Sequence, residues 1–273
     1  MVKALFFDID GTLVSFTTHK IPQTTVDAIA EAKKNGVKIY ISTGRPISLI
    51  TNLGQIEHLI DGYITTNGAY CFVDDETGRH TICCNDIPTE DIQIMLNAAS
   101  QWDRPVILVG QQDIAIYNYK EVVDDVFHKG LGVNNLDYDK PVEDVLVQPI
   151  LQMTPFISEE QEALLMLNLK NCTSGRWCLD FTDITCKAAD KGKGLLAMAE
   201  HEGFNIADTM AFGDGGNDIS IIKQAGIGVA MGNAGDEVKK NADFTTTSVD
   251  EDGIMNALIN TELSVDNIQL VHN

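Results

Sequence analysis

The first eighty residues alternate between mostly apolar runs and a segment with helical periodicity. Residues 2–9, 37–42 and 62–66 are short runs rich in β-branched and aromatic side chains. Between the first two runs, apolar positions recur at helical spacing over 21–34, and the segment closes on Asn35-Gly36. Strands that are apolar on both faces are typical of parallel sheets covered by helices. This order predicts an α/β fold with a Rossmann-like parallel-sheet core.

The pattern changes at about residue 81 and returns at about residue 188. The intervening segment is typical of an α+β unit with an antiparallel sheet. We therefore predict a core made of residues 1–80 and 188–273, with an α+β cap domain at 81–187 inserted between its halves. Within the insert the sequence predicts helices at 89–101, 121–129 and 159–171, and strands at 106–109, 114–119, 148–157, 176–181 and 184–187.

The chain is strongly acidic, and this restricts its partners. It has 19 Lys and Arg against 40 Asp and Glu, a formal net charge of -21. Such a surface repels nucleic acid and anionic membranes, so we expect neither as a partner. No apolar run approaches the roughly 18 residues of a membrane span, and Asp8 and Asp10 interrupt the N-terminal apolar run too early for a signal peptide. We expect a cytoplasmic protein, monomeric or a small homo-oligomer.

Carboxylates follow the first predicted strand. Asp8 and Asp10 stand at its carboxyl end, in the sequence Asp8-Ile9-Asp10-Gly11-Thr12. Ligands of open α/β sheets gather at this end of the strands, and residues two apart on a strand point the same way. Two converging carboxylates repel unless a cation separates them, and hard oxygen ligands suit Mg²⁺. The alternative is that Asp10-Gly11 is only a turn.

A second acidic motif follows the strand predicted at 209–212. Asp214 would lie at the strand end, with Asn217 and Asp218 in the first turn of the next helix, where the helix dipole favours acids. Taken alone, this is also compatible with a solvated helix start. Two acidic strand ends in one parallel sheet strengthen the prediction of a cation site.

Two further motifs carry groups that suit phosphate. Thr43, Gly44 and Arg45 precede Pro46 and end the second predicted strand, so they predict a helix N-terminus with free backbone N–H groups. Arg45 could also reach an anion bidentately. In the segment 190–194, Lys191 or Lys193 could offset phosphate charge. The alternatives are a helix cap with a surface arginine and a charged linker.

Together, these four motifs resemble the haloacid dehalogenase superfamily, in its Cof-like branch of phosphatases with a large α/β cap inserted after the third core strand. The resemblance extends from about Lys3 to Gly253. Any one motif is weak, but four in this order and at these element boundaries are highly specific. Thr66-Asn67-Gly68-Ala69 also resembles the Asn-Gly turn of that branch, although a plain hairpin turn remains open.

The resemblance implies a role for each motif residue. Asp8 would be the nucleophile that forms an aspartyl-phosphate, and Asp10 the general acid and then base. Mg²⁺ would be bound by Asp8, Asp214 and the backbone carbonyl of Asp10, while Asp218 would hold a metal-bound water or Lys191. The residues expected to bind the phosphoryl group are Thr43, Gly44, Arg45, Lys191 and Asn217.

The resulting functional prediction is an Mg²⁺-dependent phosphoric monoester hydrolase acting on a small phosphorylated metabolite. Sugar phosphates are the favoured substrates, and the cap loops would select among them. One alternative is a sugar phosphomutase or phosphotransferase, which would pass the phosphoryl group to a second hydroxyl. An alternative of another class is a non-catalytic sensor of phosphorylated metabolites, which would be expected to have lost Asp8 or Asp10.

Overall fold

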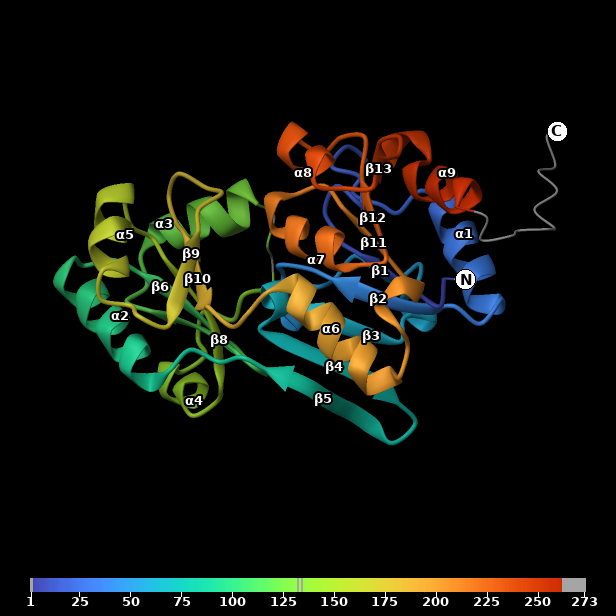
Figure 1. The fold of residues 1–273 in the computed structure, drawn as a ribbon. Coiled ribbons are helices and arrows are strands. Elements are labelled where there is room, and N and C mark those ends of the chain that lie inside the picture. The colour runs from blue at the N-terminus through green and yellow to red at the C-terminus, as the bar shows by residue number, and fades with distance from the viewer. Residues whose placement is uncertain (1, 132, 134, 262–273) are drawn as a thin grey trace. The chain divides into compact units, whose positions relative to one another are not determined.

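The structure, a computed structural model, describes residues 2–131, 133 and 135–261 (Figure 1). The chain divides into two compact units. The first unit, here called the core unit, comprises Met1–Gly44, Thr51–Ile82 and Asp190–Asn273. The second, here called the cap unit, comprises Arg45–Ile50 and Cys83–Ala189. The predicted domain bounds at 81 and 188, and substrate selection by the insert, stay predictions.

An eight-stranded sheet forms the centre of the core unit. Its strand order is β13-β12-β11-β1-β2-β3-β4-β5, and every neighbouring pair from β13 to β3 is parallel. This confirms the predicted α/β fold with a parallel-sheet core. The strands are β1 (Ala4–Phe7), β2 (Lys38–Ser42), β3 (Gly62–Thr65), β4 (Tyr70–Asp75), β5 (Gly78–Cys84), β11 (Thr209–Gly213), β12 (Ile227–Ala230) and β13 (Phe244–Thr245).

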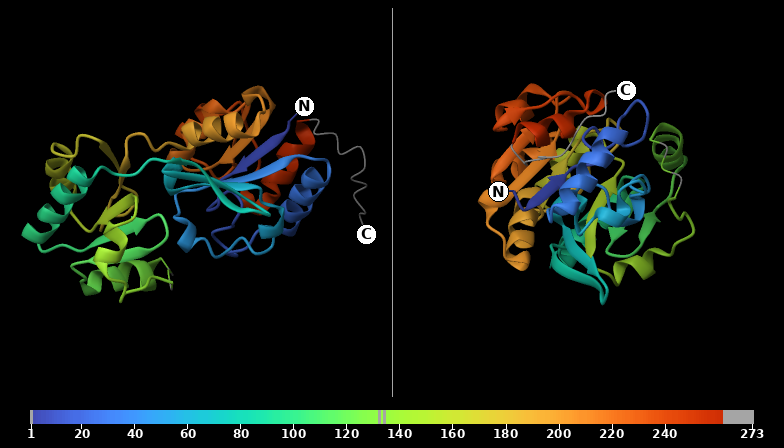
Figure 2. Two further views of the ribbon diagram at one scale, coloured as in Figure 1. Left: turned by 90° about the horizontal axis from the view of Figure 1, so that it is seen from below. Right: turned by 90° about the vertical axis from the view of Figure 1, so that its right-hand side faces the viewer.

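Helices cover both faces of this sheet. Helices α6 and α7 contact each other on one face, and α1 and α9 contact each other on the opposite face (Figure 2). As predicted, α1 carries Lys33 and Lys34 in its last turn, and the chain leaves it through Gly36 at φ 82°. The helices of the core unit are α1 (Gln23–Lys34), α6 (Lys191–Glu202), α7 (Ile219–Gln224), α8 (Asp236–Lys240) and α9 (Gly253–Asn260).

Strand β1 lies in the middle of the sheet and is buried along its whole length. Its two phenylalanines stack on aromatic rings of both neighbouring strands. Phe6 lies 4.8 Å from Tyr40 on β2, and Phe7 lies 4.9 Å from Phe212 on β11, measured between ring centroids. This packing fixes β1 between β2 and β11, so the carboxyl ends of all three strands meet at one edge.

The sequence analysis missed the hairpin formed by β4 and β5. Strand β4 pairs antiparallel with β3, so a hairpin turn does follow the third core strand. The polar sequence from Asp74 to His80 disguises the pairing. In the structure the Arg79 guanidinium pairs with Asp74 at 2.9 Å and lies over the Phe72 ring at 3.8 Å. These contacts let charged residues of the hairpin cover an apolar ring on β4, beside the edge strand β5.

The cap unit contains an antiparallel five-stranded sheet in the order β7-β6-β8-β10-β9. Buried apolar residues of α2, α5 and the sheet form one hydrophobic core. A second hydrophobic core forms around Phe127, Phe156 and Phe181. The elements of this unit are α2 (Thr89–Gln101), β6 (Val106–Gly110), β7 (Ile114–Tyr117), α3 (Glu121–Val123), α4 (Val142–Leu146), β8 (Ile150–Pro155), α5 (Glu159–Met166), β9 (Cys172–Gly175) and β10 (Asp183–Cys186), with a π-helix at Asp124–Gly130.

One predicted strand, 176–181, is wrong. This segment is the connection between β9 and β10, and the strand that pairs with β10 lies just before it. Arg176 turns the chain, because its guanidinium donates to the Ile157 carbonyl at 2.9 Å and pairs with Glu162 at 2.6 Å. The apolar composition suggested a strand, yet Leu179 is 88% exposed.

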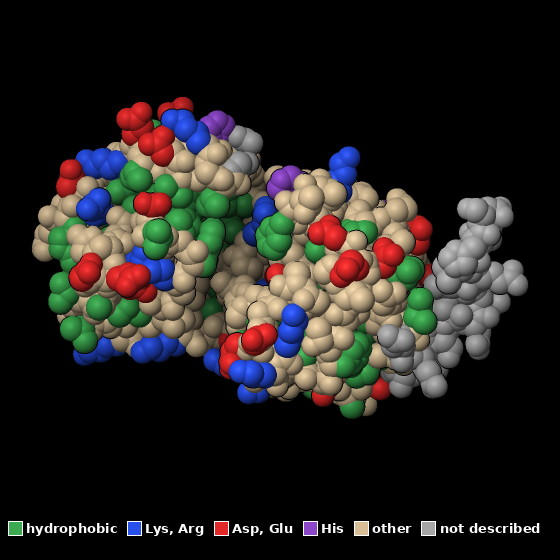
Figure 3. All heavy atoms as spheres, turned by 90° about the horizontal axis from the view of Figure 1, so that it is seen from above, with side chains coloured by type: hydrophobic (Ala, Val, Ile, Leu, Met, Phe, Trp, Pro, Cys, Tyr) green, Lys and Arg blue, Asp and Glu red, His purple; other side chains and the backbone are tan. Residues whose placement is uncertain are grey.

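Charged side chains of both signs lie on the described surface (Figure 3). Figure 3 shows Asp and Glu side chains scattered over the face seen from above, with Lys and Arg side chains among them. Among the described residues, none of the helices combines the length and the apolar composition that a membrane crossing requires.

Replacing Phe212 with Ala tests the packing of the central strands. Phe212 is 1% exposed and stacks on Phe7, and the alanine variant loses this contact. We therefore expect the free energy of unfolding, measured in urea titrations, to fall by about 3–5 kcal/mol. Leu196→Ala is the control, because Leu196 is 39% exposed and should cost less than about 1 kcal/mol. Equal losses for both variants would contradict this account of the core.

Candidate active site

The loop after β1 brings Asp8 to the edge of the sheet. The Asp8 N–H donates to the Phe212 carbonyl at 3.1 Å, which continues the pairing of β1 with β11. The chain then turns at Gly11, whose φ is 85°. A Cβ on Gly11 would lie 2.3 Å from Asp214 Oδ2, so only glycine fits this approach of the two acidic loops. Asp10, half-buried, lies in this turn and bridges to Val14.

Asp214 follows β11 and faces the Asp8 loop. Its Oδ1 accepts a hydrogen bond from Thr12 Oγ1 at 2.9 Å. Asn233 Nδ2 donates to the Gly11 carbonyl at 2.8 Å and to Asp214 Oδ2 at 3.3 Å. Asn233 was missed by the sequence analysis, although its position after β12, at the same edge of the sheet, was a usable signal. Its amide joins the loops that carry the two acidic motifs.

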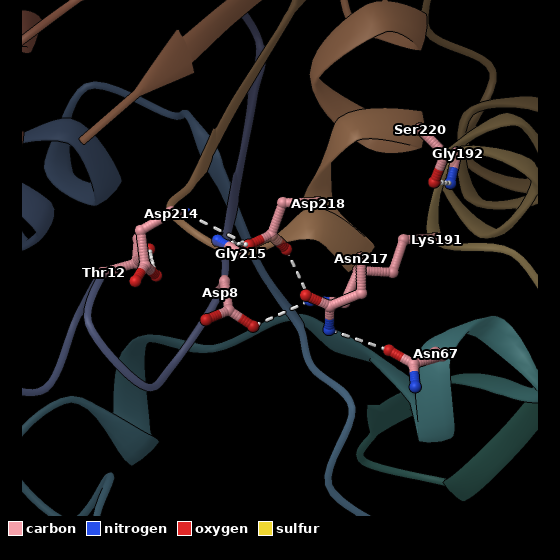
Figure 4. A network of polar contacts seen from close by, with 10 residues as sticks. All are labelled: Asp8, Thr12, Asn67, Lys191, Gly192, Asp214, Gly215, Asn217, Asp218 and Ser220. Carbon is pink, nitrogen blue, oxygen red and sulfur yellow. Dashed lines mark hydrogen bonds and ion pairs between the residues drawn. The ribbon is translucent and has the colours of Figure 1, made fainter. Parts of the chain in front are cut away.

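Lys191 links the nucleophile candidate to the second acidic motif. Its Nζ lies 2.7 Å from Asp8 Oδ1 and 2.6 Å from Asp218 Oδ1, and its side chain is fully buried (Figure 4). It is the first residue of α6, which Asp190 caps by accepting from the Lys193 N–H at 2.9 Å. The helix cap therefore fixes where Lys191 enters the site.

Asp218 uses its second oxygen for the backbone of its own loop. Its Oδ2 accepts from the N–H of Asp214 at 3.1 Å and from the N–H of Gly215 at 2.9 Å. One buried carboxylate thus holds both the Lys191 ammonium and the turn that presents Asp214 (Figure 4). Asp218 therefore contacts Lys191, one of the two partners that the resemblance implies for it, and its supporting role stays a prediction.

Three of the predicted phosphate-binding residues lie in the loops after β2 and β11. Thr43 is buried after β2, and its N–H donates to the Ile64 carbonyl at 2.8 Å. Gly44 lies close to the side chains of Asn67 and Asn217. Asn217 is exposed, and its Nδ2 donates to Asn67 Oδ1 at 2.9 Å (Figure 4).

The helix N-terminus expected at Pro46 is wrong. Only one 3-10 turn, Ile47–Leu49, follows Pro46, because Ile50 already returns to an extended conformation. The segment Arg45–Ile50 belongs to the cap unit, where Arg45 Nη1 donates to the Leu49 carbonyl at 3.2 Å. A helix dipole therefore does not contribute at this loop, and any phosphate affinity must come from side chains and individual N–H groups.

Negative charge accumulates at this edge of the core unit. Burial and the nearby Asp218 carboxylate together raise the pKa of Asp8 to about 8, although Lys191 opposes the rise. Burial also raises the pKa of Asp214 to about 6, against the hydrogen bond from Thr12. The chain's own residues therefore place more carboxylate charge here than one ammonium can balance.

The donor set fits a hard divalent cation. Carboxylate oxygens of Asp8, Asp214 and Asp218 all lie within 4.8 Å of one another. Oxygen ligands of this kind suit Mg²⁺, which takes one or two carboxylates and completes its shell with water or phosphate. Because Asp218 is engaged by Lys191 and by two N–H groups, Asp8 and Asp214 are the better candidates for direct ligands.

The comparisons with known proteins place this chain in a family. A family model described as haloacid dehalogenase-like hydrolase matches residues 5–258. YkrA of Bacillus subtilis (strain 168), named as a candidate phosphatase, is 34% identical, over 94% of this chain and 96% of its own length. The chain therefore belongs to the haloacid dehalogenase-like hydrolases, and it is a phosphoric monoester hydrolase.

Two solved structures of phosphatases are also similar. The sugar phosphatase BT4131, of haloacid dehalogenase subclass IIB, has a TM-score of 0.84 and 44% identity over 95% of this chain and 99% of its own. The phosphatase BT1666 from Bacteroides thetaiotaomicron has a TM-score of 0.83 and 34% identity over 95% of each chain. The match to a large-cap branch of this superfamily, first indicated by four short motifs, is confirmed.

The raised pKa values give a testable dependence of metal binding on pH. A carboxyl whose folded pKa is raised stabilises the fold at low pH and loses this contribution as pH rises through the folded value. For Asp214 and Asp8 this contribution is lost between about pH 4 and about pH 8. Mg²⁺ binds the deprotonated forms, so we expect it to raise the melting temperature more at pH 8.5 than at pH 5.5. Equal shifts at both pH values, measured against EDTA, would contradict this.

Proposed function

We propose that this chain is an Mg²⁺-dependent phosphatase that hydrolyses small phosphate monoesters, with sugar phosphates as the favoured class, through an aspartyl-phosphate on Asp8. The observation that carries the proposal is the convergence of two other motifs on Asp8. Lys191 contacts its carboxylate at 2.7 Å, and Asp214 and Asp218 present oxygens within 4.8 Å. The similarity to a sugar phosphatase at 44% identity supports the substrate class.

In the first half of the reaction, Asp8 attacks phosphorus and the ester P–O bond breaks. Lys191 donates a hydrogen bond to one oxygen of Asp8. This contact orients the carboxylate and favours its ionised form. Asp10, two residues further on, donates a proton to the departing alkoxide. Bound Mg²⁺, held by Asp8 and Asp214, would supply positive charge to the phosphoryl oxygens.

In the second half, Asp10 accepts a proton from the water that attacks the phosphorus of the aspartyl-phosphate. The bond between Asp8 and phosphorus breaks, and inorganic phosphate leaves. Thr43, Gly44, Arg45, Lys191 and Asn217 are the residues that we assign to the phosphoryl oxygens. A phosphomutase would transfer the same phosphoryl group to a second hydroxyl, and a sensor would bind without turnover.

A screen of phosphorylated metabolites tests the proposal directly. Each compound is incubated with the protein and Mg²⁺, and both released phosphate and isomerised product are measured. We expect phosphate release, strongest with hexose and pentose phosphates. Isomer formation without phosphate release would favour the phosphomutase, and saturable binding with neither product would favour the sensor.

Chelation should abolish turnover. Without a divalent cation, the carboxylates of Asp8, Asp214 and Asp218 would face the phosphate dianion with Lys191 as the only buried ammonium in the described cluster. We expect phosphate release to fall to background in EDTA and to return when excess Mg²⁺ is added. Undiminished turnover in EDTA would refute the metal requirement.

Replacing Asp8 with Asn tests the nucleophile. The amide has nearly the same shape but cannot form the acyl-phosphate, so we expect kcat to fall by more than roughly a thousandfold while the melting temperature changes little. Asp27→Asn is the matched control, because Asp27 is exposed on α1 and should leave kcat unchanged. Near wild-type turnover by Asp8→Asn would show that another group attacks phosphorus.

A further inference from the structure

The turn after β3 is held in an unusual backbone conformation. Thr66, Asn67 and Gly68 have φ values of 51°, 55° and 90°. The left-handed region is unfavourable for a β-branched residue such as Thr66, which is fully buried. Its Oγ1 has no hydrogen-bond partner among the described residues. Conformations of this kind persist only where surrounding contacts enforce them, and they cluster at functional sites.

The contacts of this turn reach three loops of the candidate active site. The Asn67 N–H donates to the Thr43 carbonyl at 3.0 Å. The Asn67 side chain accepts from Asn217 Nδ2 at 2.9 Å (Figure 4). Gly68 lies against the main chain of Asp190, since a Cβ on it would be 2.3 Å from the Asp190 carbonyl oxygen. The turn therefore touches the residues that precede or carry three of the four motifs.

The contact between Asn67 and Asn217 crosses the end of the nucleophile strand. Asn67 follows β3 and Asn217 follows β11, and the sheet places β2 and β1 between those two strands. The two amides thus meet across the end of β1, from which Asp8 emerges. Asn67 is half-buried and Asn217 is exposed, so this pair borders the site and is open to solvent on one side.

We propose that Asn67 is a positioning residue, which fixes the Asn217 amide and the Thr43 loop for binding the phosphoryl group. This rests on the proposed function, in which Asn217 and Thr43 contact phosphate. Asparagine suits the position, because it tolerates φ 55° and also supplies an acceptor oxygen. With one N–H of Asn217 held by Asn67, the second N–H keeps a single direction.

A glycine at position 67 tests the contribution of the Asn67 side chain apart from that of the backbone conformation. Asn67→Gly keeps the left-handed turn, since glycine adopts positive φ freely, and deletes only the amide. Asn217→Ala removes the same contact from the other side. Asn118→Gly is the matched control, because Asn118 also has a positive φ, 51°, and bonds to Asp103 and Arg104 within the cap unit.

The readouts are calorimetric binding of inorganic phosphate with Mg²⁺ present, and kcat and KM for p-nitrophenyl phosphate. We expect Asn67→Gly to weaken phosphate binding and raise KM about five- to tenfold, the size of one lost hydrogen bond, with kcat changing less than about threefold. Adding Asn67→Gly to Asn217→Ala should then change neither value by more than about twofold, because both act through one contact. Asn118→Gly should match the wild type.

Two results would overturn the inference: phosphate affinity of Asn67→Gly within twofold of the wild type, or effects of the two substitutions that multiply in the double variant. A merely structural role would lower the melting temperature and the active fraction without changing phosphate affinity. If the wild type binds phosphate but hydrolyses no ester, the proposed function fails while the binding test of Asn67 still stands. If Asn67→Gly does not fold, Asn67→Ser takes its place. The phosphate affinity of the double variant Asn217→Ala/Asn67→Ser should then lie within twofold of that of Asn217→Ala, and a larger difference would overturn the inference.

Discussion

The candidate active site depends on one buried ammonium. Lys191 lies between Asp8 and Asp218 at 2.7 and 2.6 Å, with no exposed side-chain surface. Buried charges are costly unless they are paired and fully hydrogen-bonded, so this contact persists only with the geometry of all three groups intact. Burial and Asp218 favour the protonated form of Asp8, whereas Lys191 favours the carboxylate. The ionisation state of Asp8, the proposed nucleophile, is therefore determined by a balance that a divalent cation would shift further toward the carboxylate.

The fold creates this contact from residues that are far apart in sequence. Because β1 lies between β2 and β11, the loops after these strands open at one edge, and α6 delivers Lys191 to the same place. Asp218 then serves two purposes with its two oxygens: one holds Lys191, and the other holds the turn that presents Asp214. A change at Asp218 would disturb both the position of Asp214, a proposed metal ligand, and the environment of Asp8, the proposed nucleophile.

The sequence was most informative where chemistry and strand ends coincide. Asp8, Asp214 and Lys191 were recognisable because their motifs occur together in the order typical of the family, whereas each motif alone also fits a turn, a helix start or a charged linker. Asn233 and the contact of Asn67 were not, since an asparagine in a turn is usually explained by local backbone bonding. The β4–β5 hairpin was missed because its exposed residues are charged, and 176–181 was taken for a strand because composition cannot show that Arg176 folds back onto Glu162. The contacts of Asn67 with Asn217 and of Asn233 with Gly11 join segments that are far apart in sequence, which local patterns do not encode.

The most direct test is a crystal structure with Mn²⁺ in place of Mg²⁺, because the anomalous signal of this metal identifies its position independently of the protein density. The account predicts one peak at roughly 2.2 Å from a carboxylate oxygen of Asp8 and from one of Asp214, with Lys191 still contacting Asp8. A peak bound elsewhere, with Asp8 and Asp214 not sharing a metal, would contradict the central claim that these carboxylates form a single metal-assisted phosphoryl-transfer site.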